Sequence, residues 1–310
     1  MDDLRIASDA CHAALESPEL RKVDERLRKL RIHAGEELEK VTHSPGSVGR
    51  LERLAEAGRV DRIAFARWLL VKASLAAMPR IPGWRVSPSV RRLWADEVLY
   101  FAAPAGDLSF FGLDHVRFRE MARIATLRRY PAGQFHWEIA GFPRSWLLRS
   151  HPRRWPGLLA TLGLKLGGFW PMVEPHLNAR HWGNRSLVTE PEGVSSFYRI
   201  ARSVEMQPEI RGLLACSWLY CPETAAISPH LSWMRRLFVE RGAFIDSIGP
   251  APPDAGFLIG SEQRRKLYEN GQYRPTITYV LWPRKAMLEW SRTLGEEPSS
   301  VQESAMGAGA

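Results

Sequence analysis

The chain has 310 residues, of which 45% are hydrophobic and 25% charged. This length allows one large domain or two of ordinary size, and the composition excludes a disordered, collagen-like or fibrous coiled-coil protein. No apolar stretch approaches the roughly 18 residues that a membrane span requires. The acidic N-terminus MDDLRIASDA lacks the apolar segment of a secretory signal, and three cysteines are too few for a disulfide framework. We therefore expect a cytoplasmic globular protein.

The net charge of +9 is concentrated in one part of the chain. Residues 81–160 carry twelve arginines and six acidic residues, and five tryptophans are interleaved with the arginines between residues 84 and 155. Arginines next to aromatic rings suit nucleic-acid contacts, but no helix-turn-helix, zinc-finger or RNA-recognition pattern accompanies them. A nucleic-acid partner is therefore not favoured. A non-enzymatic module that binds nucleic acid or protein through the block 84–155 is the third functional hypothesis.

Residues 1–78 are predicted to form a helical N-terminal region. Leu20, Val23, Leu27 and Leu30 follow the spacing of one helix face within a segment rich in Glu, Lys and Arg. The segment MPRIPGWRVSP, residues 78–88, contains three prolines and one glycine. These residues interrupt regular structure, so the segment is predicted to be a domain boundary.

Residues 79–292 are predicted to form an α/β core with a mixed sheet, built either as one body or as two halves. The first half, 79–170, has strand-like runs at 97–102, 109–113 and 135–139, a helical patch at 116–130, and an apolar stretch at 146–170 that suits a buried helix or two. The second half, 171–292, alternates helices at 193–208, 228–241 and 261–270 with strands at 210–220, 244–248 and 276–282. Such alternation indicates an α/β layer, and residues 293–310 read as a disordered tail.

The segment RRKLYENGQYRPTITYVL, residues 264–281, resembles a pattern of the GNAT acyltransferases: a helix ending in a Leu-Tyr-Glu-like triplet, glycine, an aromatic residue and a strand. The similar part covers less than a quarter of the chain. The resemblance implies an acyl-CoA substrate and a small-molecule or peptide acceptor. It makes Tyr268 the acid that protonates the departing thiolate, and a phenol with a pKa near 10 suits that leaving group.

The same resemblance places the cofactor on the strand 210–220 and on the turn that follows it. It implies that the backbone around Ser217, Trp218 and Tyr220 holds the pantetheine arm, and that the helix beginning at Ser228 receives the pyrophosphate at its N-terminus. GNAT enzymes usually have a glycine-rich turn there, whereas this chain has CPETAAIS, residues 221–228, without glycine. An alternative interpretation is that Tyr268 is a helix residue that packs beside a sheet.

A second hypothesis starts from RYPAGQFHWE, residues 129–138. On a strand, His136 and Glu138 share one face and could bind one metal ion. The segment resembles the run before the metal pair of 2-oxoglutarate oxygenases of the prolyl-hydroxylase type, and this resemblance implies Fe(II) with 2-oxoglutarate. His176 or His181 would then be the distal ligand, and Arg185 would bind the cosubstrate carboxylate.

The segment EPHLNARHWGNR, residues 174–185, is the densest polar and ring-bearing cluster in the chain. We expect a loop that carries substrate-binding groups or metal ligands. The candidate substrate-binding residues are His176, Asn178, Arg180, His181, Trp182 and Arg185. Since the chain contains no G-x-S-x-G, P-loop or G-x-G-x-x-G motif, it is not expected to be a serine hydrolase of that type, a nucleoside triphosphatase or a Rossmann dehydrogenase.

Overall fold

The computed structural model describes residues 2–43, 48–103, 116–178, 188–256 and 261–298. The chain divides into two compact units, Met1–Pro131 and Ala132–Ala310. Among the described residues, no helix is long and apolar enough to cross a membrane.

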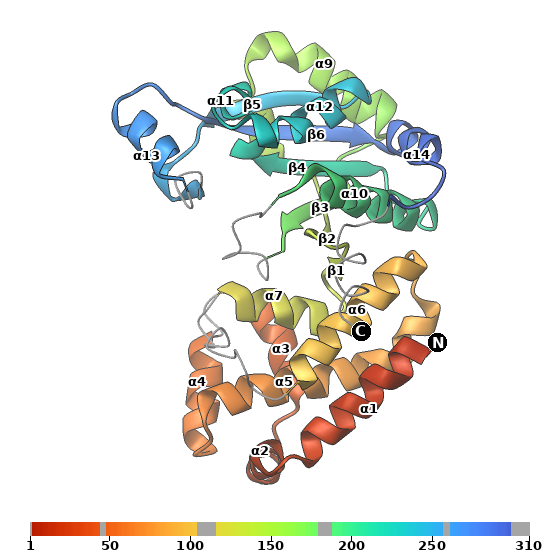
Figure 1. The fold of residues 1–310 in the computed structure, drawn as a ribbon, viewed down its shortest axis with the longest axis vertical. Coiled ribbons are helices and arrows are strands. Elements are labelled where there is room, and N and C mark those ends of the chain that lie inside the picture. Colours follow the sequence, from red (N-terminus) through yellow and green to blue (C-terminus); the bar gives the residue numbers. More distant parts are fainter. Residues whose placement is uncertain (1, 44–47, 104–115, 179–187, 257–260, 299–310) are drawn as a thin grey trace, which may run out of the picture. The chain divides into compact units, whose positions relative to one another are not determined.

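The N-terminal unit is built from helices (Figure 1). They are α1 (Asp2–Glu16), α2 (Pro18–Lys29), α3 (Ala34–His43), α4 (Val48–Ala57), α5 (Arg62–Ala77), α6 (Pro88–Ala102) and α7 (Val116–Ala125), with a 3-10 turn at Met78–Gly83. The side chain of Asp61 caps α5 by accepting hydrogen bonds from the backbone N–H groups of Ile63 and Ala64, each at 2.9 Å. Helix α5 is buried on nearly all sides, because α1, α2, α3, α6 and α7 all contact it. Helix α5 is therefore the central helix of this unit, and its apolar composition suits this buried position.

The predicted helical N-terminal region is confirmed, but the helices continue well past Met78. The Pro-rich segment 78–88 forms only a short turn, and Ser87 then caps α6 by accepting a hydrogen bond from Val90 N. The strand predicted at 97–102 is wrong, since these residues are the last part of α6. Trp94, Val98 and Phe101 are fully buried there at helical spacing. The strand predicted at 109–113 lies outside the described residues.

Asp24 links α2 to α5 and should make the stability of the N-terminal unit depend on pH. Its carboxylate accepts a hydrogen bond from Trp68 Nε1 at 2.8 Å and pairs with Lys72 Nζ at 2.9 Å. Burial alone would raise the pKa of this carboxyl group, but the hydrogen bonds from Lys72, Trp68 and Arg28 outweigh burial and lower it. The stabilisation is therefore present above the unfolded pKa of about 3.9 and is lost as the pH falls through the lower folded value.

We expect Asp24→Asn to lower the free energy of unfolding by about 1 to 2 kcal/mol near neutral pH, because charged hydrogen bonds are lost while the shape is kept. Urea denaturation of both proteins measures the difference. The two curves should converge as the pH falls through the folded pKa. A difference that stays constant on acidification would show that the carboxylate charge does not contribute.

The described part of the chain contains a six-stranded mixed sheet, which confirms the predicted α/β class, and strands β2 to β6 belong to the C-terminal unit. Its strands are β1 (Tyr130–Pro131), β2 (Phe135–Ala140), β3 (Met172–Leu177), β4 (Gly212–Ser217), β5 (Phe244–Pro250) and β6 (Thr276–Pro283). The spatial order is β1-β2-β3-β4-β6-β5. Strands β3 and β4 run parallel, whereas β2–β3, β4–β6 and β5–β6 are antiparallel. The predicted strands at 135–139, 210–220, 244–248 and 276–282 all correspond to strands of this sheet.

Helices cover both faces of the sheet (Figure 1). On one face lie the short helices α8 (Arg144–Arg149) and α9 (Trp155–Ala160), whose Leu158 packs with Leu214 of β4 and Tyr279 of β6. On the other face lie α10 (Glu190–Glu205), α12 (Ser232–Glu240) and α14 (Arg284–Thr293). There Phe238 of α12 stacks edge-on against Trp282 of β6, with ring centres 5.3 Å apart. The helices α11 (Pro222–Ile227) and α13 (Glu262–Glu269) complete the unit.

Two predicted helices and the predicted tail of this half differ from the structure in their limits. Helix α10 begins and ends three residues before the predicted 193–208. The helix predicted at 228–241 begins as a 3-10 turn, Pro229–Leu231, before α12. The tail predicted from residue 293 is wrong for its first residues, because Glu297 forms an ion pair with Arg199 and Ser195 donates a hydrogen bond to Pro298 O at 2.8 Å. Residues 299–310 lie outside the described part.

Candidate functional site

The parallel strands β3 and β4 separate after their first residues. Their only paired position along the described strands is Val173 opposite Leu213. In contrast, β3 stays paired with β2 as far as Leu177, and β4 stays paired with β6 as far as Ser217. The carboxyl-terminal halves of β3 and β4 are therefore not joined to each other. In open α/β sheets, ligands bind outside the carboxyl ends of parallel strands, so this opening is a candidate site.

Four polar side chains lie on one face of the sheet beside this opening. The antiparallel register places His136 opposite His176 and Glu138 opposite Glu174, and residues two apart on a strand share a face. Glu138 Oε1 lies 3.2 Å from His176 Nε2. Donor atoms of Glu138, Glu174 and His176 all lie within 4.8 Å of one another. We call these three residues the Glu-Glu-His cluster.

The side chains of the cluster are partly open to solvent, which a reactive site requires. The Glu138 and His176 side chains are 22% and 29% exposed. His136, by contrast, is only 2% exposed. Two carboxylates beside an imidazole can accept a proton or bind a cation, and the Nε2 atom of His176 that faces Glu138 is itself buried.

Strand β4 brings Cys216 to the same face, across the opening from Glu174. Burial raises the pKa of the Cys216 thiol to about 12, with a further increase from the Glu174 carboxylate and a smaller opposing effect from Arg149. Burial likewise raises the pKa of the Tyr220 phenol, and Cys216 and Glu174 add to this effect. Cys216 is therefore a protonated thiol near neutral pH and not a nucleophile.

Asn178, predicted to bind substrate, has a structural role here. It is 5% exposed, and its side-chain amide donates to Gly133 O at 3.1 Å while its backbone N–H donates to Gln134 O at 2.9 Å. The backbone N–H of Gln134 in turn donates to Ser196 Oγ of α10 at 3.0 Å. Gly133 has φ of +106°, and a Cβ there would lie 2.6 Å from a guanidinium nitrogen of Arg199. This turn fixes β2 and β3 against α10.

The other candidate substrate-binding residues fall into two groups. His176 belongs to the Glu-Glu-His cluster and lies on β3, not on the predicted loop. Arg180, His181, Trp182 and Arg185 lie outside the described residues, so their predicted roles stay predictions.

The residues expected to bind the cofactor gather where β4 ends. Ser217 Oγ accepts a hydrogen bond from Leu219 N at 3.2 Å. The Arg264 guanidinium lies 5.2 Å from the centre of the Trp218 ring and donates to Ser228 Oγ at 3.2 Å. Tyr268 of α13 packs on the same small apolar cluster as Trp218 and lies under Arg274, 4.7 Å from the guanidinium carbon. The structure therefore brings Tyr268, Trp218 and Ser228 into one region, whereas Tyr220 is buried.

The segment CPETAAIS is helix α11 rather than an open turn. Thr224 Oγ1 donates to Trp218 O at 2.9 Å and shares a hydrogen bond with the Tyr273 hydroxyl at 2.8 Å. Since α12 begins only at Ser232, the N-terminus of that helix lies four residues beyond the predicted position at Ser228.

The structure indicates a different set of metal ligands from the one that the sequence predicts. The sequence suggested His136, Glu138 and His176, whereas the donor atoms that converge are those of Glu138, Glu174 and His176. In the sequence alone, Glu174 is one member of the polar segment 174–185. Its partnership with Glu138 depends on the register between β2 and β3, which a lone H-x-E motif does not reveal. The cluster has two carboxylates and one imidazole, whereas non-haem iron oxygenases use two His and one carboxylate.

Comparisons with known proteins identify no relative of this chain. No family model matches the chain, and searches of curated proteins and of solved structures find no significant match.

Proposed function

We propose that the protein transfers an acyl group from a thioester of the acyl-CoA type to an amine or a similar nucleophile. The observation that carries the proposal is the separation of the parallel strands β3 and β4 after Val173 and Leu213, with α10 as the connection between them. This arrangement gives an opening at the carboxyl ends of two parallel strands, beside carboxylates and an imidazole.

The edge of β4 suits the amide-bearing arm of a thioester carrier. Beyond Leu213 this strand pairs with β6 on one side, while its other edge faces the opening. A chain with amide groups can bind such an edge through backbone hydrogen bonds, in the manner of an added strand. The proposal therefore keeps the pantetheine arm on β4, near Ser217.

The Glu-Glu-His cluster supplies the proton acceptor that the reaction needs. The amine nitrogen attacks the thioester carbonyl, so a C–N bond forms and the C–S bond breaks. The proton lost by the amine goes to the Glu138 and His176 pair, whose atoms are 3.2 Å apart. The departing thiolate takes up a proton, and Tyr268, which lies near Trp218 at the end of β4, is the proposed acid.

A titration of the full chain with acetyl-CoA, followed by a thiol-release assay, tests this function. We expect saturable binding, and release of coenzyme A thiol that depends on an added amine from a panel of polyamines, amino acids and peptides. Hydrogen exchange should show that acetyl-CoA protects the backbone amides of β3 and β4. Failure to bind acetyl-CoA and coenzyme A would refute the proposal.

Metal binding is the second candidate function, favoured specifically by the convergence of Glu138, Glu174 and His176. Carboxylate and imidazole ligands together fit Mn(II), Fe(II) or Zn(II). If an ion binds, these three residues would hold it, and it would act as a Lewis acid toward a bound carbonyl.

We expect His176→Ala to remove any bound metal, because it deletes the imidazole donor of the cluster. Elemental analysis after reconstitution with Mn(II), Fe(II) or Zn(II) measures the metal content. His151→Ala is the matched control, since His151 is exposed and lies outside the cluster. Equal metal content in the wild type and in His176→Ala would reject this site, and full thiol release in EDTA would show that acyl transfer does not need the ion.

A further inference from the structure

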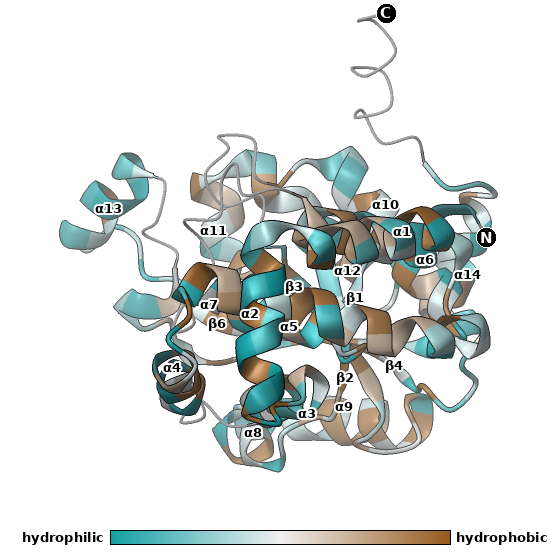
Figure 2. Ribbon diagram, turned by 90° about the horizontal axis from the view of Figure 1, so that it is seen from below, coloured by the Kyte–Doolittle hydropathy of each residue, from teal (hydrophilic) through white to brown (hydrophobic). Residues whose placement is uncertain are grey.

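The three most exposed large apolar side chains of the described residues lie close together in sequence. Leu164 is 87% exposed, Leu148 81% and Trp170 64%, whereas no large apolar residue outside residues 144–170 exceeds 53%. Trp155 and Leu159 of α9 are also exposed, but Leu158 and Leu162 are buried against the sheet. Trp155 and Leu159 therefore lie on the outward side of α9, on which Figure 2 shows brown, apolar residues.

The charge of the same segment has a single sign. Residues 139–173 contain Arg144, Arg149, Arg153, Arg154 and Lys165 and no Asp or Glu, so the segment carries five positive charges from these side chains and none that is negative. Arg154 is partly satisfied within the unit, since it donates to Ile245 O at 2.7 Å and lies 3.7 Å from Asp246. The excess of positive charge selects an anionic partner.

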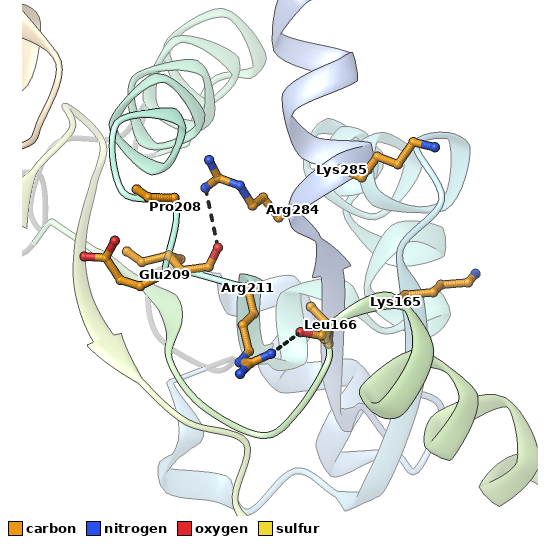
Figure 3. A pocket seen from close by; sticks show the side chains of 8 residues that line it. Lys165, Leu166, Pro208, Glu209, Arg211, Arg284 and Lys285 are labelled. Atoms are coloured by element: carbon orange, nitrogen blue, oxygen red, sulfur yellow. Dashed lines mark hydrogen bonds between the residues drawn. The ribbon is translucent and has the colours of Figure 1, made fainter.

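A basic pocket adjoins the exposed apolar residues. It has a volume of about 400 Å³ and is lined by Lys165, Leu166, Pro208, Glu209, Ile210, Arg211, Arg284 and Lys285. Figure 3 shows the carboxylate of Glu209 directed away from Lys165 and Lys285. The Arg211 guanidinium donates to Leu166 O at 3.1 Å and to Trp170 O at 2.7 Å. These bonds fasten the pocket to the segment that carries Leu164 and Trp170.

The cations of this pocket are partly neutralised by carboxylates, since Glu205 and Glu209 act electrostatically on Arg284. Arg211 and Arg284 donate mainly to backbone carbonyls, those of Arg284 belonging to Val204, Glu205 and Gln207. Lys285 is 88% exposed and has Glu289 at 3.9 Å as its carboxylate neighbour. An exposed ion pair at that distance contributes little, so the exposed Lys165 and Lys285 can attract a phosphate group.

We propose that the surface made of the exposed apolar residues of 144–170 and this basic pocket docks onto an anionic phospholipid membrane. Leu148, Leu159 and Leu164 would enter the boundary between headgroups and acyl chains, and Trp170 would lie at headgroup level. Lys165 and Lys285 would contact lipid phosphates, and the surrounding arginines would add attraction to the negatively charged surface. Docking of this kind is peripheral and does not depend on the acyl-transfer proposal.

Co-sedimentation of the full chain with vesicles tests this inference. We expect binding to vesicles of phosphatidylcholine with phosphatidylglycerol to exceed binding to phosphatidylcholine alone by at least about tenfold and to weaken as salt is added. The double substitution Leu148→Ser with Leu164→Ser should reduce binding by at least about tenfold, because two apolar side chains no longer enter the membrane. Val239→Ser is the matched control, since Val239 is an exposed apolar residue of α12.

Several results would overturn the inference. One is equal binding to neutral and anionic vesicles, and another is unchanged binding of the double Leu variant. Binding of inorganic phosphate or RNA without vesicle binding would assign the basic pocket to a soluble anion or a nucleic acid instead. Circular dichroism of each variant separates lost binding from lost structure, and the thiol-release assay shows independently whether acyl transfer persists.

Discussion

Glu138→Gln should lower the rate of acyl transfer by at least about 100-fold, the effect expected when a general base is removed. Glutamine keeps the size of the side chain and can hydrogen-bond to His176, but it cannot accept the proton of the attacking amine. Binding of acetyl-CoA should persist, because the proposed thioester-binding edge belongs to β4. The loss should therefore appear in kcat and leave the Kd for acetyl-CoA nearly unchanged.

Glu240→Gln is the control for this experiment, because Glu240 is an exposed carboxylate of α12 outside the cluster. His176→Gln should show a defect similar to that of Glu138→Gln, and combining the two should add little, since the pair acts as one unit. A fully active Glu138→Gln variant, with the fold intact by circular dichroism, would remove the cluster from the mechanism.

Gly212→Val should lower the free energy of unfolding by about 3 kcal/mol, at the upper end of overpacking effects. A Cβ at residue 212 would lie 2.3 Å from the carbonyl oxygen of Trp282 and 2.7 Å from Cδ2 of Leu166. The first neighbour is backbone in the β4–β6 ladder, where Gly212 lies opposite Pro283. Relief of the clash would therefore disturb the start of β4, the strand proposed to bind the thioester.

Urea denaturation of the Gly212→Val variant measures this effect. Gly163→Ala is the matched control in the same unit, because a Cβ there meets no atom within 4 Å; its stability should equal or slightly exceed that of the wild type. Wild-type stability in Gly212→Val would mean that β4 and β6 are not held as closely as the structure shows.

The sequence predicted helices and strands best where a single local pattern determines the secondary structure. Apolar runs predicted β4 and β6, and Gly271 just after the predicted segment 261–270 helped to predict α13 as a helix. The same reasoning failed for 97–102, because a short aromatic and β-branched run suits a strand and a buried helix face equally well. Packing against the N-terminal helices, with Trp94, Val98 and Phe101 in the core, decides for the helix.

The candidate site was only partly predictable, because it depends on pairing between distant strands. His136, Glu138 and His176 stood out as residue types, but only the register of β2 with β3 joins Glu174 to Glu138. The separation of β3 from β4 has no local signal at all, since each strand is fully paired on its other side. Asn178 shows the converse, because a polar residue in a promising segment serves to fix a turn.

Isothermal titration of the full chain with acetyl-CoA, combined with hydrogen exchange of the complex, tests the central claim most directly. The proposal predicts one binding event per chain, with added protection of the backbone amides of β3 and β4 beyond Val173 and Leu213. Absence of binding, or protection confined to other parts of the chain, would contradict a thioester site between these strands.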